Sequence, residues 1–191
     1  AAWNLAGGST TGAHPFTDVA DGIYFAEHVA TLYQRGITIG VTPTNYGPQQ
    51  VVTRSQMAAF LARTYEVMTG SACIGSHPFI DVTDNTYFAH DVGCLYSLGV
   101  TVGTSPETFS PDRELSRAEM AAFLARMFNA VSGGTCSGTH SFIDVPPASF
   151  YADAVGCLKI HNITTGTSAS HYSPNLAVDR GQMASFLARL M

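Results

Sequence analysis

One stretch of 63 residues recurs three times along this chain without an insertion or a deletion. Asp81 lies 63 positions after Asp18, and Asp144 lies 63 positions after Asp81. Self-similarity at a fixed period is typical of repeat proteins, in which each unit packs against its neighbours. The sequence therefore predicts three copies of one structural unit. We place a lead-in at residues 1–13 and the three units at 14–76, 77–139 and 140–191.

Each unit ends in a segment that carries the signals of an amphipathic helix. In the first unit Thr53 is a good N-cap residue, and Gln56 stands three positions later, as in a capping box. Met57, Phe60 and Leu61 follow at helical spacing, which predicts one buried stripe. Ser116 and Asp179 hold the N-cap position in the other two units.

An earlier segment of each unit also has helical spacing, and in the first unit it covers residues 24–36. Ala26, Val29, Ala30 and Tyr33 would form its packed face. The segment stops at a residue suited to a left-handed conformation, which is Gly36, Gly99 or Asn162. The predicted fold class is all-α, mainly helical with loops, with three pseudo-symmetric helix-loop-helix repeats.

An arginine follows the N-cap residue in every unit, at Arg54, Arg117 and Arg180. A cation in the first turn opposes the helix dipole, at a cost of a few tenths to roughly 1 kcal/mol. A residue placed there three times despite this cost is expected to have a partner. That partner is either a nearby carboxylate or an anionic ligand at the helix N-terminus, and both can hold together.

The four cysteines occupy only two positions of the repeat. They are Cys73, Cys94, Cys136 and Cys157. The first unit has Thr10 and Thr31 at these positions, and the joint loss of both is what a bonded pair predicts. Of the three possible connectivities, Cys73–Cys94 with Cys136–Cys157 follows the repeat. A zinc site is the competing interpretation, but it lacks the close paired spacing of zinc motifs. Two disulfides indicate an oxidising, extracellular setting.

Composition excludes several classes of function. Charged residues make up only 12% of the chain and the net charge is -5, so no basic stripe is available for nucleic acid. The apolar runs are far shorter than the roughly 20 residues of a membrane span. Triplicated residues supply one role three times, whereas catalysis needs different roles together, so we expect no enzyme and no cofactor. His14, His77 and His140 recur at one repeat position and a threefold arrangement could bring them together as a metal site, but we expect no metal.

The order of motifs within each unit resembles a known family. In the first unit these motifs are Phe16-Thr17-Asp18-Val19, Gly36 and Gly40, Tyr46-Gly47-Pro48, and Thr53-Arg54-Ser55-Gln56. The chain resembles three tandem S-layer homology domains, over roughly residues 14–191. The resemblance implies a three-pronged spindle around a pseudo-threefold axis, with the C-terminal helices of the units at its centre. It also implies grooves between the prongs that bind cell-wall polysaccharide with acidic substituents, such as pyruvyl ketals.

The resemblance assigns candidate binding residues by position. They are the arginines Arg54, Arg117 and Arg180, the aspartates Asp18, Asp81 and Asp144, the aromatics Tyr24, Tyr87 and Phe150, and the glycines Gly40, Gly103 and Gly166. The motif that contains the arginine departs from the family pattern, because only the middle unit keeps an acidic last residue, Glu119. Phe150 also replaces a hydrogen-bonding aromatic in the third unit.

These residue types suit an acidic sugar. Its carboxylate matches a guanidinium, its hydroxyls match a carboxylate, and its apolar face matches an aromatic ring. Structural roles compete with this interpretation. Asp18 and its equivalents could form an Asx-type turn or cap the first helix. Tyr24 and Tyr87 could pack in the core with an exposed hydroxyl.

The predicted function is a non-catalytic, extracellular module at the cell surface that binds acidic cell-wall polysaccharide. The alternative is a structural subunit that assembles with itself into an extracellular layer, sheath or filament. The alternative is motivated by the three units, which fill the given sequence.

Overall fold

The computed structural model describes residues 13–191, so nearly all of the predicted lead-in, including Thr10, lies outside the described residues. The described part contains six α-helices and isolated β-bridges, and no β-strand. The helices are α1 (Ala26–Gln34), α2 (Arg54–Thr69), α3 (Ala89–Ser97), α4 (Arg117–Ser132), α5 (Ala152–Ile160) and α6 (Arg180–Leu190). The predicted all-α class is confirmed.

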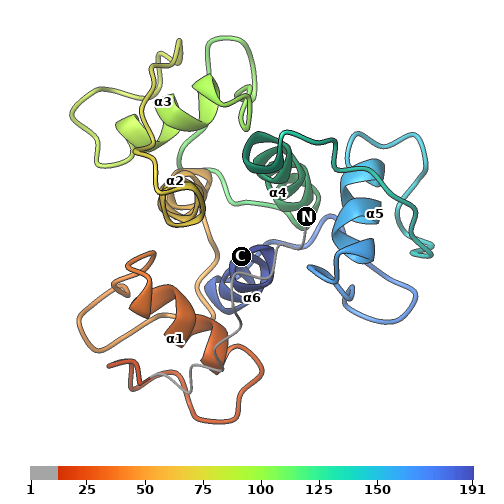
Figure 1. Ribbon diagram of the computed structural model, residues 1–191, viewed down its shortest axis with the longest axis horizontal. Helices are drawn as coiled ribbons and strands as arrows, with labels where there is room; N and C mark the ends of the chain where they lie inside the picture. Colours follow the sequence, from red (N-terminus) through yellow and green to blue (C-terminus); the bar gives the residue numbers. More distant parts are fainter. Residues whose placement is uncertain (1–12) are drawn as a thin grey trace.

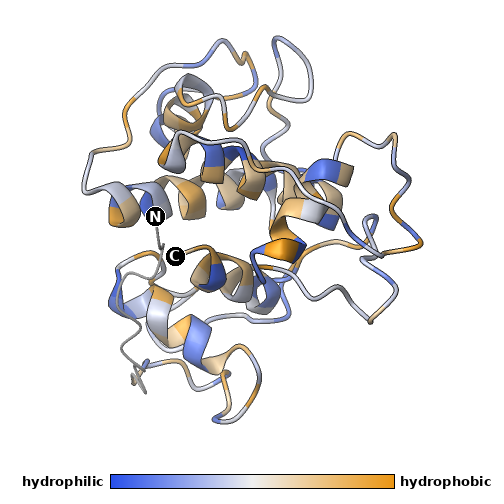
Figure 2. Cartoon of the chain, turned by 45° about the vertical axis from the view of Figure 1, so that its right-hand side comes forward, coloured by the Kyte–Doolittle hydropathy of each residue, from blue (hydrophilic) through white to orange (hydrophobic). Residues whose placement is uncertain are grey.

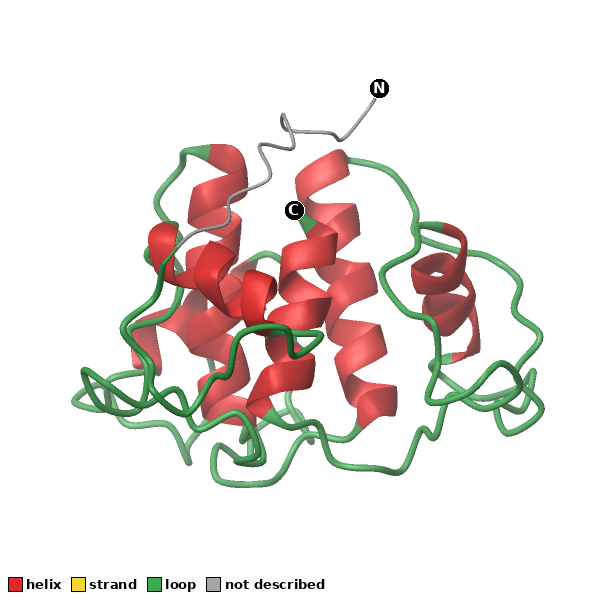
Figure 3. Ribbon diagram, turned by 90° about the horizontal axis from the view of Figure 1, so that it is seen from below, coloured by secondary structure: helices red, strands yellow, loops and turns green. Residues whose placement is uncertain are grey.

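The helices form a three-pronged arrangement (Figure 1). The long helices α2, α4 and α6 stand together at the centre, and the short helices α1, α3 and α5 lie around them. Figure 3 shows that most loops gather at the end where the long helices begin. This is the spindle that the family resemblance implied.

Each short helix packs against a long helix from a different repeat. Helix α3 packs on α2, α5 packs on α4, and α1 packs on α6. A prong therefore joins the long helix of one unit to the short helix of the next, and the first unit closes on the third. The three repeats consequently form a ring rather than an open stack.

A triangle of backbone hydrogen bonds holds the ring together at the start of the long helices. The amide of Val52 donates to the carbonyl of Val178 (2.8 Å), Val178 donates to Leu115 (2.9 Å), and Leu115 donates to Val52 (2.9 Å). All three side chains are fully buried. Each unit thus donates one bond and accepts one bond around the pseudo-threefold axis.

The predicted helix starts are confirmed. Thr53 and Ser116 form complete capping boxes, and the carboxylate of Asp179 accepts a hydrogen bond from the amide of Gln182 (2.7 Å). Alternation of apolar and polar residues along the helices is visible in Figure 2, as expected for amphipathic helices. No helix in residues 13–191 is both long enough and apolar enough to cross a membrane.

Both predicted disulfides are present, with Cα–Cα distances of 5.3 Å for Cys73–Cys94 and 5.4 Å for Cys136–Cys157. Each bond ties the segment that follows a long helix to the short helix packed against it. Two of the three prongs therefore carry a covalent link. The α1–α6 prong has Thr31 at the corresponding position of α1.

Candidate functional site: the grooves between the prongs

The three first-turn arginines lie buried at the contacts between repeats. Arg54 is 3% exposed, its Nε donates to the carbonyl of Phe109 (2.7 Å), and its guanidinium lies over the Phe109 ring. The same bond joins Arg117 to Tyr172 and Arg180 to Tyr46, each at 2.7 Å. These contacts offset the unfavourable helix dipole, because a hydrogen bond from a charged donor is worth about 1.5–3 kcal/mol. Each arginine thus joins its own long helix to an aromatic residue of the next repeat around the ring.

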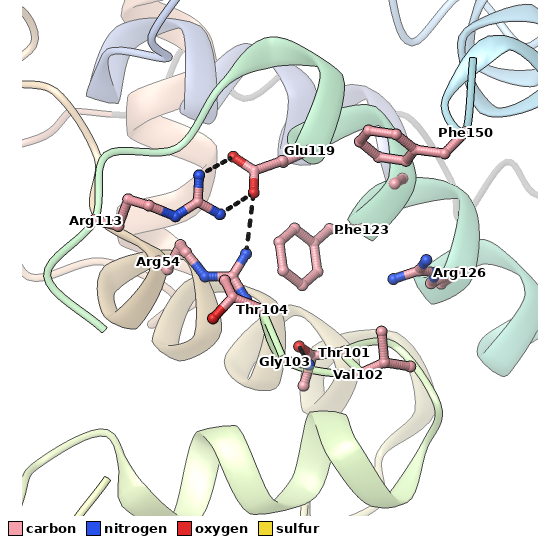
Figure 4. A pocket seen from close by; sticks show the side chains of 11 residues that line it. Arg54, Thr101, Val102, Gly103, Thr104, Arg113, Glu119, Phe123, Arg126 and Phe150 are labelled. Atoms are coloured by element: carbon pink, nitrogen blue, oxygen red, sulfur yellow. Dashed lines mark hydrogen bonds and ion pairs between the residues drawn. The ribbon is translucent and has the colours of Figure 1, made fainter. Parts of the chain in front are cut away.

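The outer edge of the Arg54 guanidinium meets a carboxylate. Its Nη1 lies 3.4 Å from Oε1 of Glu119, and Arg113 also binds Glu119 (Figure 4). Burial lowers the pKa of Arg54 to about 10, although Glu119 opposes this shift. Burial would raise the pKa of Glu119, but hydrogen bonds from Arg113 and the Ser116 amide lower it. Arg54 therefore has the structural ion pair that was one of the two predicted partners.

The corresponding contact of Arg117 is to a neutral side chain. Its Nη1 lies 3.5 Å from the amide oxygen of Gln182, which holds the repeat position of Glu119. Burial lowers the pKa of Arg117 as well. The two arginines thus share their buried contacts but differ in the charge beside their outer edge.

Arg54 lines a cavity of about 400 Å³ between the α2–α3 prong and the α4–α5 prong, which we call the Arg54 groove. Gly103, Glu119, Arg126 and Phe150 are among its other lining residues (Figure 4). The groove combines three repeats, because Arg54 comes from the first, Gly103 and Glu119 from the second, and Phe150 from the third.

Arg117 lines a second cavity, of about 270 Å³, between the α4–α5 prong and the α1–α6 prong. We call it the Arg117 groove, and Tyr24, Gly166, Gln182 and Arg189 are among its other lining residues. The structure thus brings together an arginine, a glycine and an aromatic residue from the predicted set in each groove. Tyr87 is correspondingly close enough to Arg180 to oppose the lowering of its pKa by burial.

The aromatic residues of the predicted set point outward rather than into the core. Tyr24 is 62% exposed, Tyr87 69% and Phe150 71%. The structural alternative for Tyr24 and Tyr87, packing in the core with an exposed hydroxyl, is therefore wrong, because most of each side chain is exposed. Exposed rings at the edge of a groove are available to stack on a ligand.

The three aspartates hold loops of their own repeats. The carboxylate of Asp18 accepts hydrogen bonds from the amides of Tyr46 (2.8 Å) and Gly47 (2.7 Å). Asp81 does the same for Phe109 and Ser110, and Asp144 for Tyr172 and Ser173. This is neither an Asx turn nor a cap of the first helix, because the partners lie 28 and 29 residues away. A ligand role for these aspartates stays a prediction.

The glycines of the set have a packing reason of their own. Gly40, Gly103 and Gly166 have φ values of +83°, +78° and +81°. A Cβ atom on Gly103 would lie 2.5 Å from the Phe79 ring and 2.5 Å from two backbone oxygens. The bare backbone of Gly103 and Gly166 nevertheless lines a groove, so close approach of a sugar there stays a prediction.

Sequence reasoning missed a second set of arginines. Arg126 lines the Arg54 groove and Arg189 lines the Arg117 groove, and Arg63 holds the same repeat position. Arg126 is half-buried and Arg189 is exposed, in contrast to the first-turn arginines. Their recurrence at the period of 63 was the available signal, but the sequence did not show that α4 and α6 turn these side chains into grooves.

The recurring histidines have structural partners. His14, His77 and His140 each accept a hydrogen bond at Nδ1 from the amide of the phenylalanine two positions later, at 3.2 Å. Each imidazole also stacks on that phenylalanine ring. In residues 13–191 there is no group of three or more side chains placed to bind a metal ion.

A closed ring of three helix pairs, with two grooves at corresponding places between adjacent pairs, defines a pseudo-threefold helical repeat protein. The family model for the S-layer homology domain matches residues 15–58, 78–121 and 141–184. The chain belongs to the S-layer homology domain family. The resemblance noted in the sequence is confirmed.

Several relatives share this region within much longer proteins. A cell surface protein of Thermoanaerobacter kivui is 38% identical over 59% of this chain and 15% of its own length. An exoglucanase of Acetivibrio thermocellus is 30% identical over 92% of the chain and 16% of its own length. An S-layer protein of Bacillus licheniformis is 21% identical over 91% of the chain and 19% of its own length. The chain thus spans less than a fifth of each of these relatives. Family and relatives place it at the cell surface, as an anchoring module.

Proposed function

We propose that the chain anchors a protein to the cell wall by binding acidic polysaccharide in the grooves between its prongs. The observation that carries the proposal is the composition of the grooves. Each combines a guanidinium, a glycine backbone and an exposed aromatic ring, and the three parts come from three different repeats.

The chemistry of such a groove suits a sugar that bears a carboxylate. The aromatic ring stacks on the apolar face of the sugar, and the groove arginines attract its negative charge. The buried arginines Arg54, Arg117 and Arg180 offer only their outer edge, so the more accessible Arg126 and Arg189 share this role. Arg180, Tyr87 and Gly40 hold the same repeat positions, and we expect the same roles for them. The three aspartates hold loops of their own repeats.

Catalysis has no support in this arrangement. An arginine, a glycine and an aromatic ring recur at equivalent places in the two grooves, whereas an acid, a base and a nucleophile would need different surroundings. Relatives with enzyme names carry this region as a small part of their length, which fits a module that serves a separate catalytic domain.

Self-assembly is the alternative function, and the comparison with the relatives weakens the main observation in its favour. The three repeats fill the given sequence, which favours a structural subunit, but the relatives carry such repeats within longer chains. Sedimentation of the purified chain that shows monomer at all concentrations would contradict assembly and leave the grooves free for polysaccharide.

The decisive test is a pull-down on purified cell-wall polysaccharide with the exposed aromatics changed. We expect the variant with Tyr24→Ala, Tyr87→Ala and Phe150→Ala to lose most binding. These side chains are mostly exposed, so the fold should persist, which circular dichroism would check. The matched control is Ile80→Ala with Ile143→Ala, two side chains as exposed as the aromatics. Undiminished binding of the aromatic variant would contradict the proposal.

A further inference from the structure

The residues that line the two grooves carry the same formal charge at neutral pH. The Arg54 groove is lined by three arginines and one carboxylate, whereas the Arg117 groove is lined by two arginines and no carboxylate. The carboxylate is Glu119, and hydrogen bonds from Arg113 and the Ser116 amide lower its pKa, so it keeps its charge in mild acid. A difference in charge between the grooves must therefore come from a residue that titrates beside one of them.

His28 lies beside the Arg117 groove. It belongs to the first turn of α1, and its Nδ1 lies 3.0 Å from Oγ of Ser185, which lines the groove. Arg189, another lining residue, is close enough to His28 to lower its pKa. Asp91 holds the same repeat position in α3, and Arg63 of α2 acts on its pKa in the same way. Both short helices thus place this repeat position near an arginine of the long helix on which they pack.

The hydrogen bonds of Ser185 indicate which nitrogen of His28 carries a proton. The Ser185 hydroxyl has a single hydrogen, which it donates to the carbonyl of Gly181 (3.2 Å). Its oxygen therefore accepts a hydrogen bond from Nδ1 of His28, and Nε2 is the unprotonated nitrogen of the neutral ring. A second proton binds at Nε2. Protonation of His28 thus adds a positive charge beside the groove and preserves the contact with Ser185.

The charges around His28 keep its ring neutral at pH 7.5. Burial lowers its pKa, Arg189 of α6 lowers it further, and Glu27 on its own helix opposes both. The ring therefore takes up its proton in acid. The Arg54 groove has Ala154 at the equivalent position and gains no charge there.

A second histidine lies near the Arg117 groove. The carbonyl of His171 accepts a hydrogen bond from the amide of Thr167 (2.8 Å), which lines the groove. The His171 ring is exposed and contacts the hydroxyls of Ser168 and Ser170 in its own loop. His171 is therefore the matched control for any effect of His28.

We propose that His28 makes the Arg117 groove bind an acid-bearing sugar more tightly in acid than at neutral pH, whereas the Arg54 groove shows no such change. This inference rests on the proposed function and adds a residue that sets the affinity of one groove. The protonated imidazole attracts the carboxylate of the sugar, which stays ionised because an ordinary carboxyl group titrates below about pH 4. The neutral imidazole provides no such attraction.

The test uses two probes that differ only in one carboxylate. The acidic probe is a methyl glucoside with a 4,6-pyruvyl ketal, and the neutral probe is its 4,6-ethylidene analogue. Titrations followed by NMR at pH 7.5 and pH 5 use the amide of Gly166 as reporter for the Arg117 groove and that of Gly103 for the Arg54 groove. At Gly166 we expect the affinity for the acidic probe to rise about three- to tenfold in acid. The neutral probe at Gly166, and both probes at Gly103, should show no such rise.

The same coupling should appear in reverse, because linkage between a proton and a ligand is reciprocal. The acidic probe at saturation should raise the pKa of His28, which the imidazole proton resonances measure directly. The neutral probe should leave that pKa unchanged. This measurement uses the parent chain, so it does not depend on the folding of a variant.

Substitution of His28 should remove the effect of acid. In His28→Ala the affinity at Gly166 should no longer rise between pH 7.5 and pH 5, and Ala154 shows that a short helix accommodates alanine at this position. The matched control is His171→Thr, which removes the other histidine and introduces the residue that the second repeat has there, Thr108. This control should keep the rise.

The outcomes separate the inference from the function on which it rests. The inference is overturned if the affinity at Gly166 does not rise in acid, if the rise persists in His28→Ala, or if the acidic probe leaves the pKa of His28 unchanged. Binding of the acidic probe at pH 7.5 would in each case still support the proposed function. If the acidic probe moves neither glycine resonance at millimolar concentration at either pH, the proposed function is overturned, and the inference with it.

Discussion

Tyr46 and Arg180 lie 134 positions apart in the sequence and exchange two hydrogen bonds. The Tyr46 hydroxyl donates to the carbonyl of Arg180 (2.8 Å), and Nε of Arg180 donates to the carbonyl of Tyr46 (2.7 Å). The pair closes the ring between the first and third repeats. Tyr172 and Arg117 form the same pair, but Phe109 has no hydroxyl to offer Arg54.

The missing hydroxyl predicts opposite effects of two substitutions. Tyr46→Phe should lower the free energy of unfolding by about 1–2 kcal/mol, because it removes a buried hydrogen bond. Phe109→Tyr should raise it by about 1 kcal/mol, since the other two repeats accommodate tyrosine there. Urea unfolding measures both, with Tyr33→Phe on the surface as control. A destabilising Phe109→Tyr would show that the three ring contacts are not equivalent.

The disulfides predict uneven stability among the prongs. Replacing Cys73 and Cys94 by serine should cost about 3 kcal/mol, because the bond closes a loop of about 20 residues. Hydrogen exchange after reduction should speed up in α3 and α5 far more than in α1, whose prong has no disulfide in the described residues. Equal acceleration in all three short helices would contradict this.

Gly103 and Gly99 both have a positive φ, but only at Gly103 would an added Cβ atom clash with its neighbours. Alanine substitutions at the two positions therefore separate the cost of backbone strain from the cost of the clash. Gly103→Ala combines a positive φ with a Cβ position 2.5 Å from the Phe79 ring, so it should cost more than about 2 kcal/mol. Gly99→Ala has a positive φ of +68° but open space around the new Cβ, and should cost about 1 kcal/mol. Thermal unfolding of the two variants side by side measures the difference. Equal costs would mean that the loop around Gly103 can move aside.

The hydrogen bonds to the Asp144 carboxylate predict that the stability of the folded protein falls in acid. Burial would raise its pKa, but hydrogen bonds from the Tyr172 and Ser173 amides outweigh burial and lower it. A carboxyl whose pKa is lower in the folded state stabilises the protein above its unfolded pKa of about 3.9. This stabilisation is lost as the pH falls through the folded pKa. Asp144→Asn should therefore be less stable than the parent chain at pH 6, and the gap should narrow below pH 3. A gap independent of pH would contradict a role for the charge.

Much of the fold could be predicted from the sequence. The period of 63, the caps at Thr53, Ser116 and Asp179, and the cysteine pairing are local or repeat-wise signals, and all were confirmed. The partner of each short helix was not predictable, because the same period is compatible with packing inside a repeat or between repeats. The prediction of the packed face of α1 was partly wrong, because Leu32 is fully buried and Tyr33 is 38% exposed. A helix of nine residues has too few turns to define its packed stripe.

The candidate site was predictable only as a set of residue types. Repetition identified the arginines, aspartates, aromatics and glycines, but it could not show which of them share a groove. That grouping depends on the ring, which places Arg117 of the second unit beside Tyr24 of the first. The two hydrogen bonds that Asp18 accepts from the amides of Tyr46 and Gly47 likewise span 28 and 29 residues, so no local sequence signal predicts them.

The hydrogen-bond triangle of Val52, Leu115 and Val178 fixes the number of units. In an open solenoid each end exposes a face on which a further unit can stack. Here every backbone donor and acceptor of the triangle is already paired. A fourth copy inserted in tandem would therefore find no free backbone group with which to join the ring. Such a chain should fold as one complete ring of three units with one extra unit attached. A longer array should gain a further ring only when three more units are present.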